Sequence, residues 1–293
     1  MHSITNVLYF TFISARSTTW IRIAAELLIG FAASQATLSS QLSTFFLAFL
    51  IVGPFFSTAA YILNDITDIN LDKKHLSRKD RPITKGNFNI NTALLVSIFL
   101  FSVSVILGYT ISATFMVWVI LLGISQSLYT LKPFRFKEKF FFDILINGLS
   151  GGMRFILGYL VGKSELTSLP LLLLLFAICL KVILFIGHRL QNRDLERKSN
   201  FKSTIASLTV AQIKILLTVL ILLAGFLYIT SMIYYQWSYL SIVPIILLTL
   251  FLVPFIMVVG KGYLLTQEKT LFWRVYLYIA LLMFSLSFYS VLR

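Results

Sequence analysis

The sequence is poor in cysteine, in acid and in charge of either sign. Its single cysteine, Cys179, excludes an intrachain disulfide. Of its 293 residues only 12% are charged and 58% are hydrophobic, with a mean hydropathy of +0.89. This composition excludes an ordinary water-soluble domain and is typical of a polytopic membrane protein. Residues 1–18 lack the basic segment, apolar core and small-residue site of a cleaved signal peptide, so none is expected.

Several common site chemistries are also missing from the sequence. It contains no Walker loop, no Gly-rich dinucleotide turn and no G-x-S-x-G elbow. No cluster of His and Cys suggests zinc. The net charge of +14 could suggest a nucleic-acid partner. Basic loops beside apolar spans explain that charge more simply, so no nucleic acid is expected.

Long apolar stretches dominate what is present. A membrane-spanning helix needs roughly 20 mainly apolar residues. Nine such stretches occur, at about 19–38, 44–64, 92–110, 113–130, 141–161, 169–188, 205–230, 239–259 and 272–291. We therefore predict an all-α integral membrane protein of nine transmembrane helices, forming one domain over residues 1–293. Acidic segments after the second and sixth spans further predict two similar four-helix halves, about 15–130 and 141–260, plus a ninth helix.

Basic residues alternate from loop to loop. The segments after spans two, four, six and eight are rich in Lys and Arg, whereas the other four connections hold only Lys163. The positive-inside rule then places the N-terminus and the charged loops in the cytoplasm, and the C-terminus outside. The expected location is the plasma (inner) membrane, with lipids as neighbours.

Most of the scarce acid lies in two short segments, of which Asn64–Gly86 is the first. Asp65, Asp68 and Asp72 follow a long uncharged run and precede six Lys or Arg. Offsets of three and seven place the three carboxylates on one face of a helix. Carboxylates this close repel one another unless cations neutralise them. Oxygen ligands of this kind suit Mg²⁺, which is usually held by a few carboxylates plus substrate phosphates. A solvated loop with scattered charge is the alternative, which the scarcity of acid elsewhere disfavours.

The second acidic segment, residues 187–204, follows the sixth predicted span on the same membrane face. Asn192 and Glu196 are four residues apart and would share a helix face, with Asp194 between them. Taken alone, an ordinary juxtamembrane loop explains this segment equally well. Together with the first motif it becomes a second half of a metal–phosphate site.

Basic residues outside the two motifs are weaker candidates. The Tyr129–Lys137 loop offers Lys132, Arg135 and Lys137 beside aromatic rings. They could hold a diphosphate, although the positive-inside rule alone would also place them there.

Ionisable residues within the spans are judged by their depth. Arg154 lies about three turns into its span, where such a group usually faces the bundle interior and has a function. Asp143, at the start of the same span, is explained as a helix cap. Lys181 and Lys214 lie near enough to helix ends to snorkel, so neither is expected at a site. Gly151-Gly152 indicates close helix packing.

The motif residues resemble a known family. N-D-x-x-D-x-x-x-D at Asn64–Asp72, followed by R-P-I-x-x-G at Arg81–Gly86, resembles the first signature of the UbiA superfamily of intramembrane prenyltransferases. The resemblance extends over roughly residues 15–293. That family's second signature usually reads D-x-x-x-D, whereas Asn192 and Glu196 occupy its ends here. An Asn can coordinate through its carbonyl oxygen but brings no charge.

The resemblance implies a UbiA-like bundle with a polar cytoplasmic cap over a lipid-open cavity. It implies Mg²⁺ as cofactor, an isoprenoid diphosphate as donor and a lipophilic, aromatic acceptor, and it leaves the oligomeric state open. The metal ligands it implies are Asn64, Asp65, Asp68, Asp72, Asn192, Asp194 and Glu196. The residues it implies around phosphate are Arg81, Lys132 and Arg154, with Asn64, Arg78, Lys79, Tyr129 and Arg189 as further substrate contacts.

Two alternatives to a prenyltransferase remain. The His75–Ile83 run is also similar to the H-P-x-K-R-x-R-P-I run of polyprenyl-phosphate phosphoribosyltransferases, which implies phosphoribosyl diphosphate as donor. Leu76 stands where that branch has proline, and Asp194 and Glu196 fit the prenyl-diphosphate enzymes better. The other alternative is a membrane transporter. Transporter sites usually lie near the bilayer midplane, whereas these acids are predicted at one membrane face.

Overall fold

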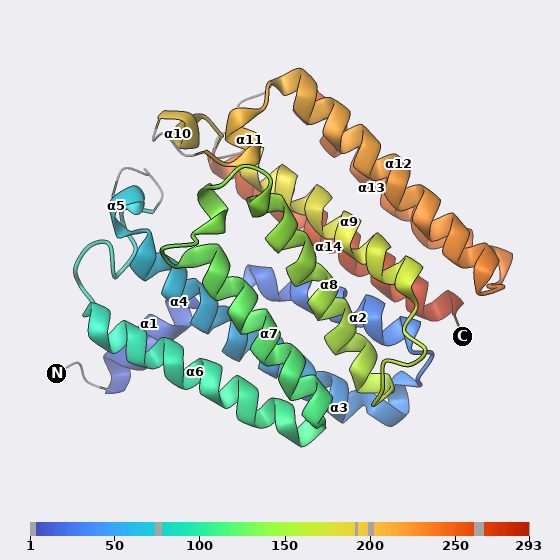
Figure 1. Ribbon diagram of the computed structural model, residues 1–293, viewed down its shortest axis with the longest axis horizontal. Coiled ribbons are helices and arrows are strands. Elements are labelled where there is room, and N and C mark those ends of the chain that lie inside the picture. Colours follow the sequence, from blue (N-terminus) through green and yellow to red (C-terminus); the bar gives the residue numbers. More distant parts are fainter. Residues whose placement is uncertain (1–3, 74–77, 191–192, 199–201, 261–266, 293) are drawn as a thin grey trace.

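The computed structural model describes residues 4–73, 78–190, 193–198, 202–260 and 267–292 (Figure 1). Within these ranges the chain forms helices and no strand. The helices are α1 Ile4–Ser14, α2 Thr18–Ala33, α3 Leu38–Leu50, η1 Ile51–Ser57, α4 Thr58–Thr67, α5 Ile69–Asp72, α6 Ile90–Ile111, α7 Ala113–Thr130, η2 Phe136–Glu138, α8 Phe142–Gly162, α9 Leu171–Leu190, α10 Arg193–Lys198, α11 Thr204–Ser207, α12 Val210–Tyr234, η3 Tyr239–Ser241, α13 Ile242–Gly260 and α14 Gln267–Val291.

Each predicted span coincides with a helix in the described part of the chain. Among the described residues, six helical stretches are long and apolar enough to cross a membrane, namely Leu38–Thr67, α6, α7, α8, α9 and α12. Large apolar side chains such as Phe99 on α6 and Phe226 on α12 face outward, as contact with lipid requires. The all-helical membrane architecture is thus confirmed, while the count of nine spans remains a prediction. Helix α1 is a further apolar helix that the sequence analysis did not predict.

Helix α2 packs against both α8 and α14, and α9 packs between α8 and α12. Glycines allow the α2–α8 pair to approach closely. A Cβ atom on Gly158 of α8 would collide with the backbone oxygen of Leu27, and one on Gly30 of α2 with that of Phe155. Small residues at helix interfaces serve the same purpose in other membrane bundles.

The predicted packing role of Gly151-Gly152 is confirmed at the α8–α9 contact. A Cβ atom on Gly151 would lie 2.6 Å from Cγ of Lys181, and one on Gly152 would lie 2.8 Å from Cγ1 of Ile178. The missing side chain at Gly151 therefore leaves room for the aliphatic part of Lys181 between the two helices.

The stretch Leu38–Thr67 changes its helical geometry around Pro54. Residues of η1 form a π-helix that contains Pro54, between the α-helical segments α3 and α4. Proline has no N–H to donate and clashes with the preceding turn of an α-helix. The wider π turn accommodates it, and such turns often occur at functional sites. Phe56 and Ser57 of this turn line the cavity described below.

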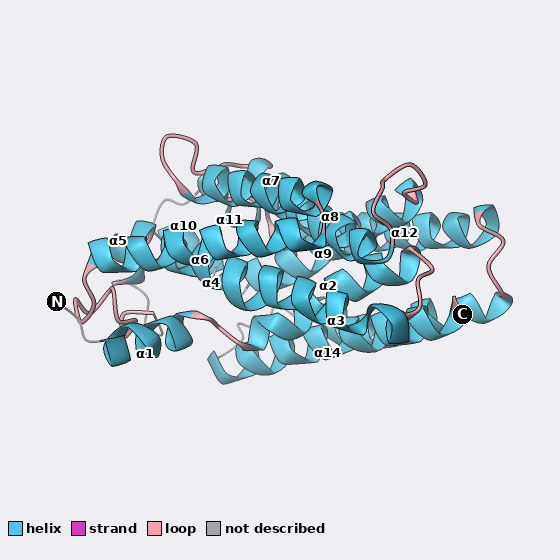
Figure 2. Cartoon of the chain, turned by 90° about the horizontal axis from the view of Figure 1, so that it is seen from below, coloured by secondary structure: helices cyan, strands magenta, loops and turns pink. Residues whose placement is uncertain are grey.

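The short polar helices α5, α10 and α11 gather at one end of the bundle (Figure 1). In the view from below, α5 and α10 again lie toward one end of the bundle, and α12 extends toward the other end (Figure 2). The two acidic segments therefore lie at the same end, as their predicted shared membrane face requires.

The orientation of this end toward the cytoplasm is a testable prediction. Lys73 follows α5, whereas Ser164 lies in the α8–α9 loop at the opposite end. In a Cys179→Ser background, we expect a membrane-impermeant thiol reagent to label Lys73→Cys only from the cytoplasm and Ser164→Cys only from outside. Labelling of both from the same side would contradict the nine-span topology.

Candidate functional site

A cavity of about 410 Å³ opens among α2, α4, α8, α9 and α10, next to the two acidic segments. Among the described residues that line it, eight are Arg or Lys and two are Asp or Glu. The acids are Asp68 and Glu196. A cavity with this excess of positive charge favours an anionic ligand.

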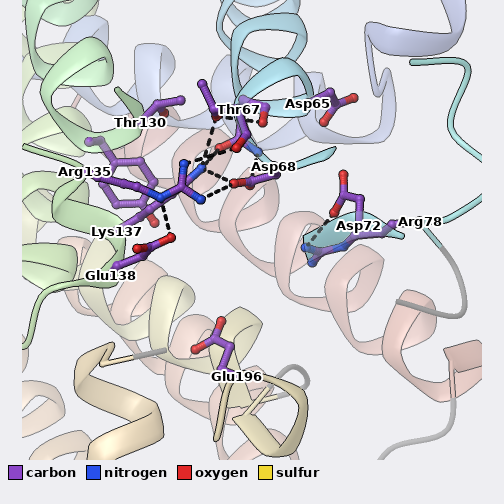
Figure 3. A network of polar contacts seen from close by, with 12 residues as sticks. Asp65, Thr67, Asp68, Asp72, Arg78, Thr130, Arg135, Lys137, Glu138 and Glu196 are labelled. Carbon is purple, nitrogen blue, oxygen red and sulfur yellow. Dashed lines mark hydrogen bonds and ion pairs between the residues drawn. The ribbon is translucent and has the colours of Figure 1, made fainter. Parts of the chain in front are cut away.

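The first motif lies at the end of α4 and in α5. Helix α4 ends at Thr67, Asp68 departs from helical geometry with φ −104°, and α5 resumes at Ile69. Asp65 therefore lies in α4 and Asp72 in α5, with Asp68 at the junction between them, so the prediction that the three carboxylates share one helix face is wrong. All three carboxylates are buried, at 6%, 5% and 0% exposed. Figure 3 shows how they lie relative to Glu196 and to the basic side chains around them.

Arg81 joins the first and third carboxylates of this motif. Its Nη1 atom donates to Asp65 Oδ1 at 2.7 Å and to Asp72 Oδ2 at 2.6 Å. Arg16 also pairs with Asp65, and Arg78 lies 3.7 Å from Asp72 Oδ1. That Oδ1 atom is buried and has no hydrogen-bond partner among the described residues. Burial raises the pKa of Asp72, and Arg81 and Arg78 oppose this effect.

Two basic residues of the Tyr129–Lys137 loop converge on Asp68. Arg135 Nη2 donates to Asp68 Oδ1 at 2.9 Å, and Lys137 Nζ donates to the same oxygen at 2.6 Å (Figure 3). Lys137 also donates to Asn64 Oδ1 at 2.8 Å. Its side chain is almost fully buried, and burial lowers its pKa to about 8, although Asp68 raises it.

The sequence analysis favoured Lys132 in this loop, and the structure places it elsewhere. Lys132 is exposed and lines a separate hollow of about 580 Å³ between α4, α6 and α7. Lys79 is also exposed and is not among the described residues that line the cavity. The sequence offered Lys132, Arg135 and Lys137 together, but nothing in their spacing showed which of them would reach Asp68.

Glu196, from the second acidic segment, lines the cavity. It lies on α10, is 4% exposed, and accepts hydrogen bonds from Arg189 Nη1 and, at 2.6 Å, from Ser203 Oγ. Arg189 also donates to the backbone oxygen of Lys137 at 2.7 Å and lies 3.3 Å from the Tyr129 hydroxyl. One guanidinium therefore connects the second acidic segment to the Tyr129–Lys137 loop. Asn192 lies outside the described residues, as does the side chain of Asp194.

Asp143 holds the loop end of α8 in place. Its carboxylate accepts hydrogen bonds from the backbone N–H, at 3.2 Å, and from the hydroxyl of Thr204. Thr204 begins α11, so the side chain links two loops rather than capping its own helix. Phe141 occupies the N-cap position of α8 instead.

Arg154 lines the cavity as predicted, but its partner was missed. It contacts Glu26, a buried carboxylate in α2 that the sequence analysis did not single out. Lys181 contacts the same carboxylate and is 2% exposed, so the prediction that it snorkels is wrong. A lone acid inside a predicted span was the available signal for Glu26, because such groups usually face the bundle interior.

The described residues could hold Mg²⁺ only if a bound ligand supplied further oxygen atoms to its coordination shell. Among the described residues, no three His, Cys, Asp or Glu side chains are grouped closely enough to hold a metal ion. Mg²⁺ is commonly bound by one or two carboxylates, with water and substrate phosphates completing its shell. Asn64, Asp68 and Glu196 line the cavity with oxygen donors of that kind.

Comparison with known proteins identifies related chains. The model of the UbiA prenyltransferase family matches residues 25–282. The chain is 32% identical over 102 residues to digeranylgeranylglyceryl phosphate synthase of Methanosphaera stadtmanae, covering 35% of this chain and 36% of that protein. It is 28% identical over 132 residues to protoheme IX farnesyltransferase of Baumannia cicadellinicola, covering 44% of this chain and 45% of that protein. These matches span less than half the length of either relative.

Solved structures with the same fold cover nearly the whole chain. A UbiA homologue from Archaeoglobus fulgidus bound to GPP and Mg²⁺ matches with a TM-score of 0.76 and 17% identity, over 96% of this chain and all of that one (100%). A homologue from Aeropyrum pernix K1 matches with a TM-score of 0.74 and 15% identity, over 91% and 96% of the two chains. At these identities the likeness establishes the fold alone.

Proposed function

This chain belongs to the UbiA prenyltransferase family, and from that premise we propose that it transfers a prenyl group from a prenyl diphosphate to a lipophilic acceptor within the membrane. The observation that carries the proposal is the charge of the cavity, with eight basic and two acidic residues in its described lining. The donor's diphosphate is the strongly anionic group of such a reaction.

The basic residues of the cavity would bind and orient this diphosphate. Arg81 pairs with Asp72, and Lys137 pairs with Asp68. Arg189 pairs with Glu196, and all three basic residues line the cavity. Charge-assisted hydrogen bonds from such groups to phosphate oxygens are strong, and arginine can form two in parallel. They would stabilise the charge that grows on the diphosphate as its bond to the prenyl carbon breaks.

We propose that Asn64, Asp68 and Glu196 hold Mg²⁺ together with the donor's phosphate oxygens. Asp65 and Asp72 would support this arrangement through Arg81, which pairs with both. When bound, Mg²⁺ would add Lewis-acid stabilisation of the leaving diphosphate.

Apolar groups in the same cavity suit the prenyl part of the donor. Phe56, Tyr61, Leu184 and Phe185 line it alongside the basic residues. Aromatic faces attract cations, and an apolar wall excludes water that would otherwise capture an allylic cation. The cavity would thereby favour transfer of the prenyl group to the acceptor over its hydrolysis.

The test compares two donors. Purified protein with Mg²⁺ is expected to release pyrophosphate from geranyl diphosphate when a membrane lipid extract supplies acceptors, with a prenylated product detected by mass spectrometry. EDTA should abolish this release and added Mg²⁺ should restore it. The parallel reaction with phosphoribosyl diphosphate and a polyprenyl phosphate should give none. Pyrophosphate release from phosphoribosyl diphosphate alone would overturn the prenyl assignment, and full turnover in EDTA would remove the metal from it.

A further inference from the structure

The hollow between α4, α6 and α7 has no part in the proposed reaction, although it is larger than the cavity. Its volume is about 580 Å³, and we call it the lateral groove. Apolar side chains form most of its wall, among them Leu63 of α4, Leu94 and Ile98 of α6 and Ile124 of α7. Ile98 is 53% exposed and Ile124 is 50% exposed, so the groove opens at the surface of the bundle. In a membrane-spanning bundle this surface faces lipid.

Small residues on all three helices leave room for the lateral groove. Ala59 and Ala60 lie on α4, Ser97 on α6 and Gly123 on α7. A Cβ atom on Gly123 would lie 2.5 Å from the ring of Phe101, so this ring uses the space of the missing side chain. The Ser97 hydroxyl donates to the backbone oxygen of Ala59 at 2.8 Å and joins α6 to α4. The groove is therefore built into the packing of the helices.

Lys132 lies at the end of the lateral groove that is nearest the motif loops. It is exposed and follows α7, which ends at Thr130. Arg135 and Lys137 of the same loop pair with Asp68, whereas Lys132 forms no ion pair with any described residue. Among the described residues that line the groove, Lys132 alone carries a charge. An unpaired cation at the mouth of an apolar groove complements an anionic group that carries an apolar chain.

The depth of the lateral groove matches one leaflet of a bilayer. Ile120 is its deepest lining residue on α7 and precedes Thr130 by ten residues, which corresponds to about 15 Å along the helix. The hydrocarbon core of a bilayer is roughly 30 Å thick, so each leaflet contributes about 15 Å. A lipid with its head group at Lys132 would therefore extend one chain along the groove without leaving its own leaflet.

We propose that the lateral groove binds an anionic phospholipid of the surrounding membrane, with its phosphate at Lys132 and one acyl chain between α4, α6 and α7. The groove and the catalytic cavity share Phe56, Ala60 and Gln126 as lining residues. The lipid would lie against the other side of this shared wall and support α4, which carries Asp65. A second hollow of about 590 Å³, among α8, α9 and α12, has no charged residue in its described lining, so it offers no such preference for an anion.

Lipid binding tests this proposal without turnover. Purified protein in nonionic detergent is titrated with anionic dioleoyl phosphatidylglycerol or with zwitterionic dioleoyl phosphatidylcholine, and bound lipid is counted by native mass spectrometry. The two lipids have the same acyl chains and differ in net charge. We expect one phosphatidylglycerol to bind about fivefold or more tightly than phosphatidylcholine, the effect of one lysine near a membrane surface. Phosphatidylglycerol should also raise the melting temperature more, because a ligand of the folded state stabilises it.

Three variants separate the head-group contact from the groove and from surface charge in general. Lys132→Gln removes the charge at the mouth of the groove and should abolish the preference for phosphatidylglycerol. Ser127→Phe places a ring in the groove and should weaken the binding of both lipids. Lys139→Gln is the matched control, because Lys139 is exposed and near Lys132 in sequence but is not among the described residues that line the groove. This control should keep the wild-type preference.

Equal affinity of the wild-type protein for the two lipids would overturn the proposal, and this comparison decides the question even if a variant fails to fold. Equal losses of preference in Lys132→Gln and Lys139→Gln would also overturn it, because they would reflect surface charge in general. Competitive displacement of phosphatidylglycerol by geranylgeranyl diphosphate would assign the groove to the chain of the donor instead. Failure of the proposed prenyl transfer would leave all these binding measurements unchanged.

Discussion

Replacing Asp68 with asparagine is expected to reduce kcat/KM for prenyl transfer by about 100-fold or more, because the variant loses a preorganised charge at the reacting diphosphate. Asp68 accepts hydrogen bonds from Arg135 and Lys137 and lines the cavity. Asparagine keeps the size and an acceptor oxygen of the side chain but removes its negative charge. We therefore expect the variant to fold and to need a higher Mg²⁺ concentration for half-maximal activity. Steady-state kinetics with geranyl diphosphate at several Mg²⁺ concentrations measure both effects.

Asp80→Asn is the matched control for this substitution. Asp80 belongs to the same acidic segment, but it is exposed and pairs with Lys85 at 3.0 Å on the surface. Exposed ion pairs contribute little, so its activity should stay within about twofold of wild type. Wild-type activity in Asp68→Asn, or equal losses in the two variants, would contradict the assignment of Asp68 to the site.

Replacing Gly158 with alanine is expected to destabilise the protein strongly, by about 1–3 kcal/mol or more. The new methyl group would collide with the backbone oxygen of Leu27, which cannot rotate away as a flexible side chain could. Helices α2 and α8 would have to separate, which would also disturb the pairing of Arg154 with Glu26. Thermal unfolding in detergent measures the loss.

Gly225→Ala provides the comparison. Gly225 lies inside α12, and a Cβ atom there would meet no other atom within 4 Å. Alanine is favoured over glycine within helices by about 1 kcal/mol. This variant should therefore be as stable as the wild type or more stable. Similar melting temperatures for Gly158→Ala and wild type would show that α2 and α8 tolerate greater separation than the structure indicates.

The membrane architecture and the first motif could be predicted because both are local properties of the chain. Apolar runs of span length coincide with helices throughout the described residues, since a membrane-embedded backbone must satisfy its hydrogen bonds internally. The spacing of Asp65, Asp68 and Asp72 identified the acidic motif, but it did not show that the helix is interrupted at Asp68. The two-half organisation and the cytoplasmic orientation remain predictions.

The partners of those carboxylates could not be predicted, because they come from distant parts of the chain. Lys137 reaches Asp68 across 69 positions of sequence, and Lys181 reaches Glu26 across 155. Snorkelling was a reasonable expectation for Lys181, but Gly151 leaves room for its side chain to run inward between α8 and α9. Only the packing of the helices shows which lysine side chain is exposed to water and which pairs with a buried carboxylate.

The sequence alone therefore determined the class of protein, the helical segments and the acidic motif of the outer site, since periodicity, hydropathy and short spacings carry that information. The tertiary structure decided which basic residues face the cavity and that Arg154 and Lys181 pair with Glu26. The physical reason is that burial and pairing of charge depend on helices brought together across the whole chain. Glu26 is an isolated acid in the sequence, and it becomes the centre of an ion cluster only where α2, α8 and α9 meet.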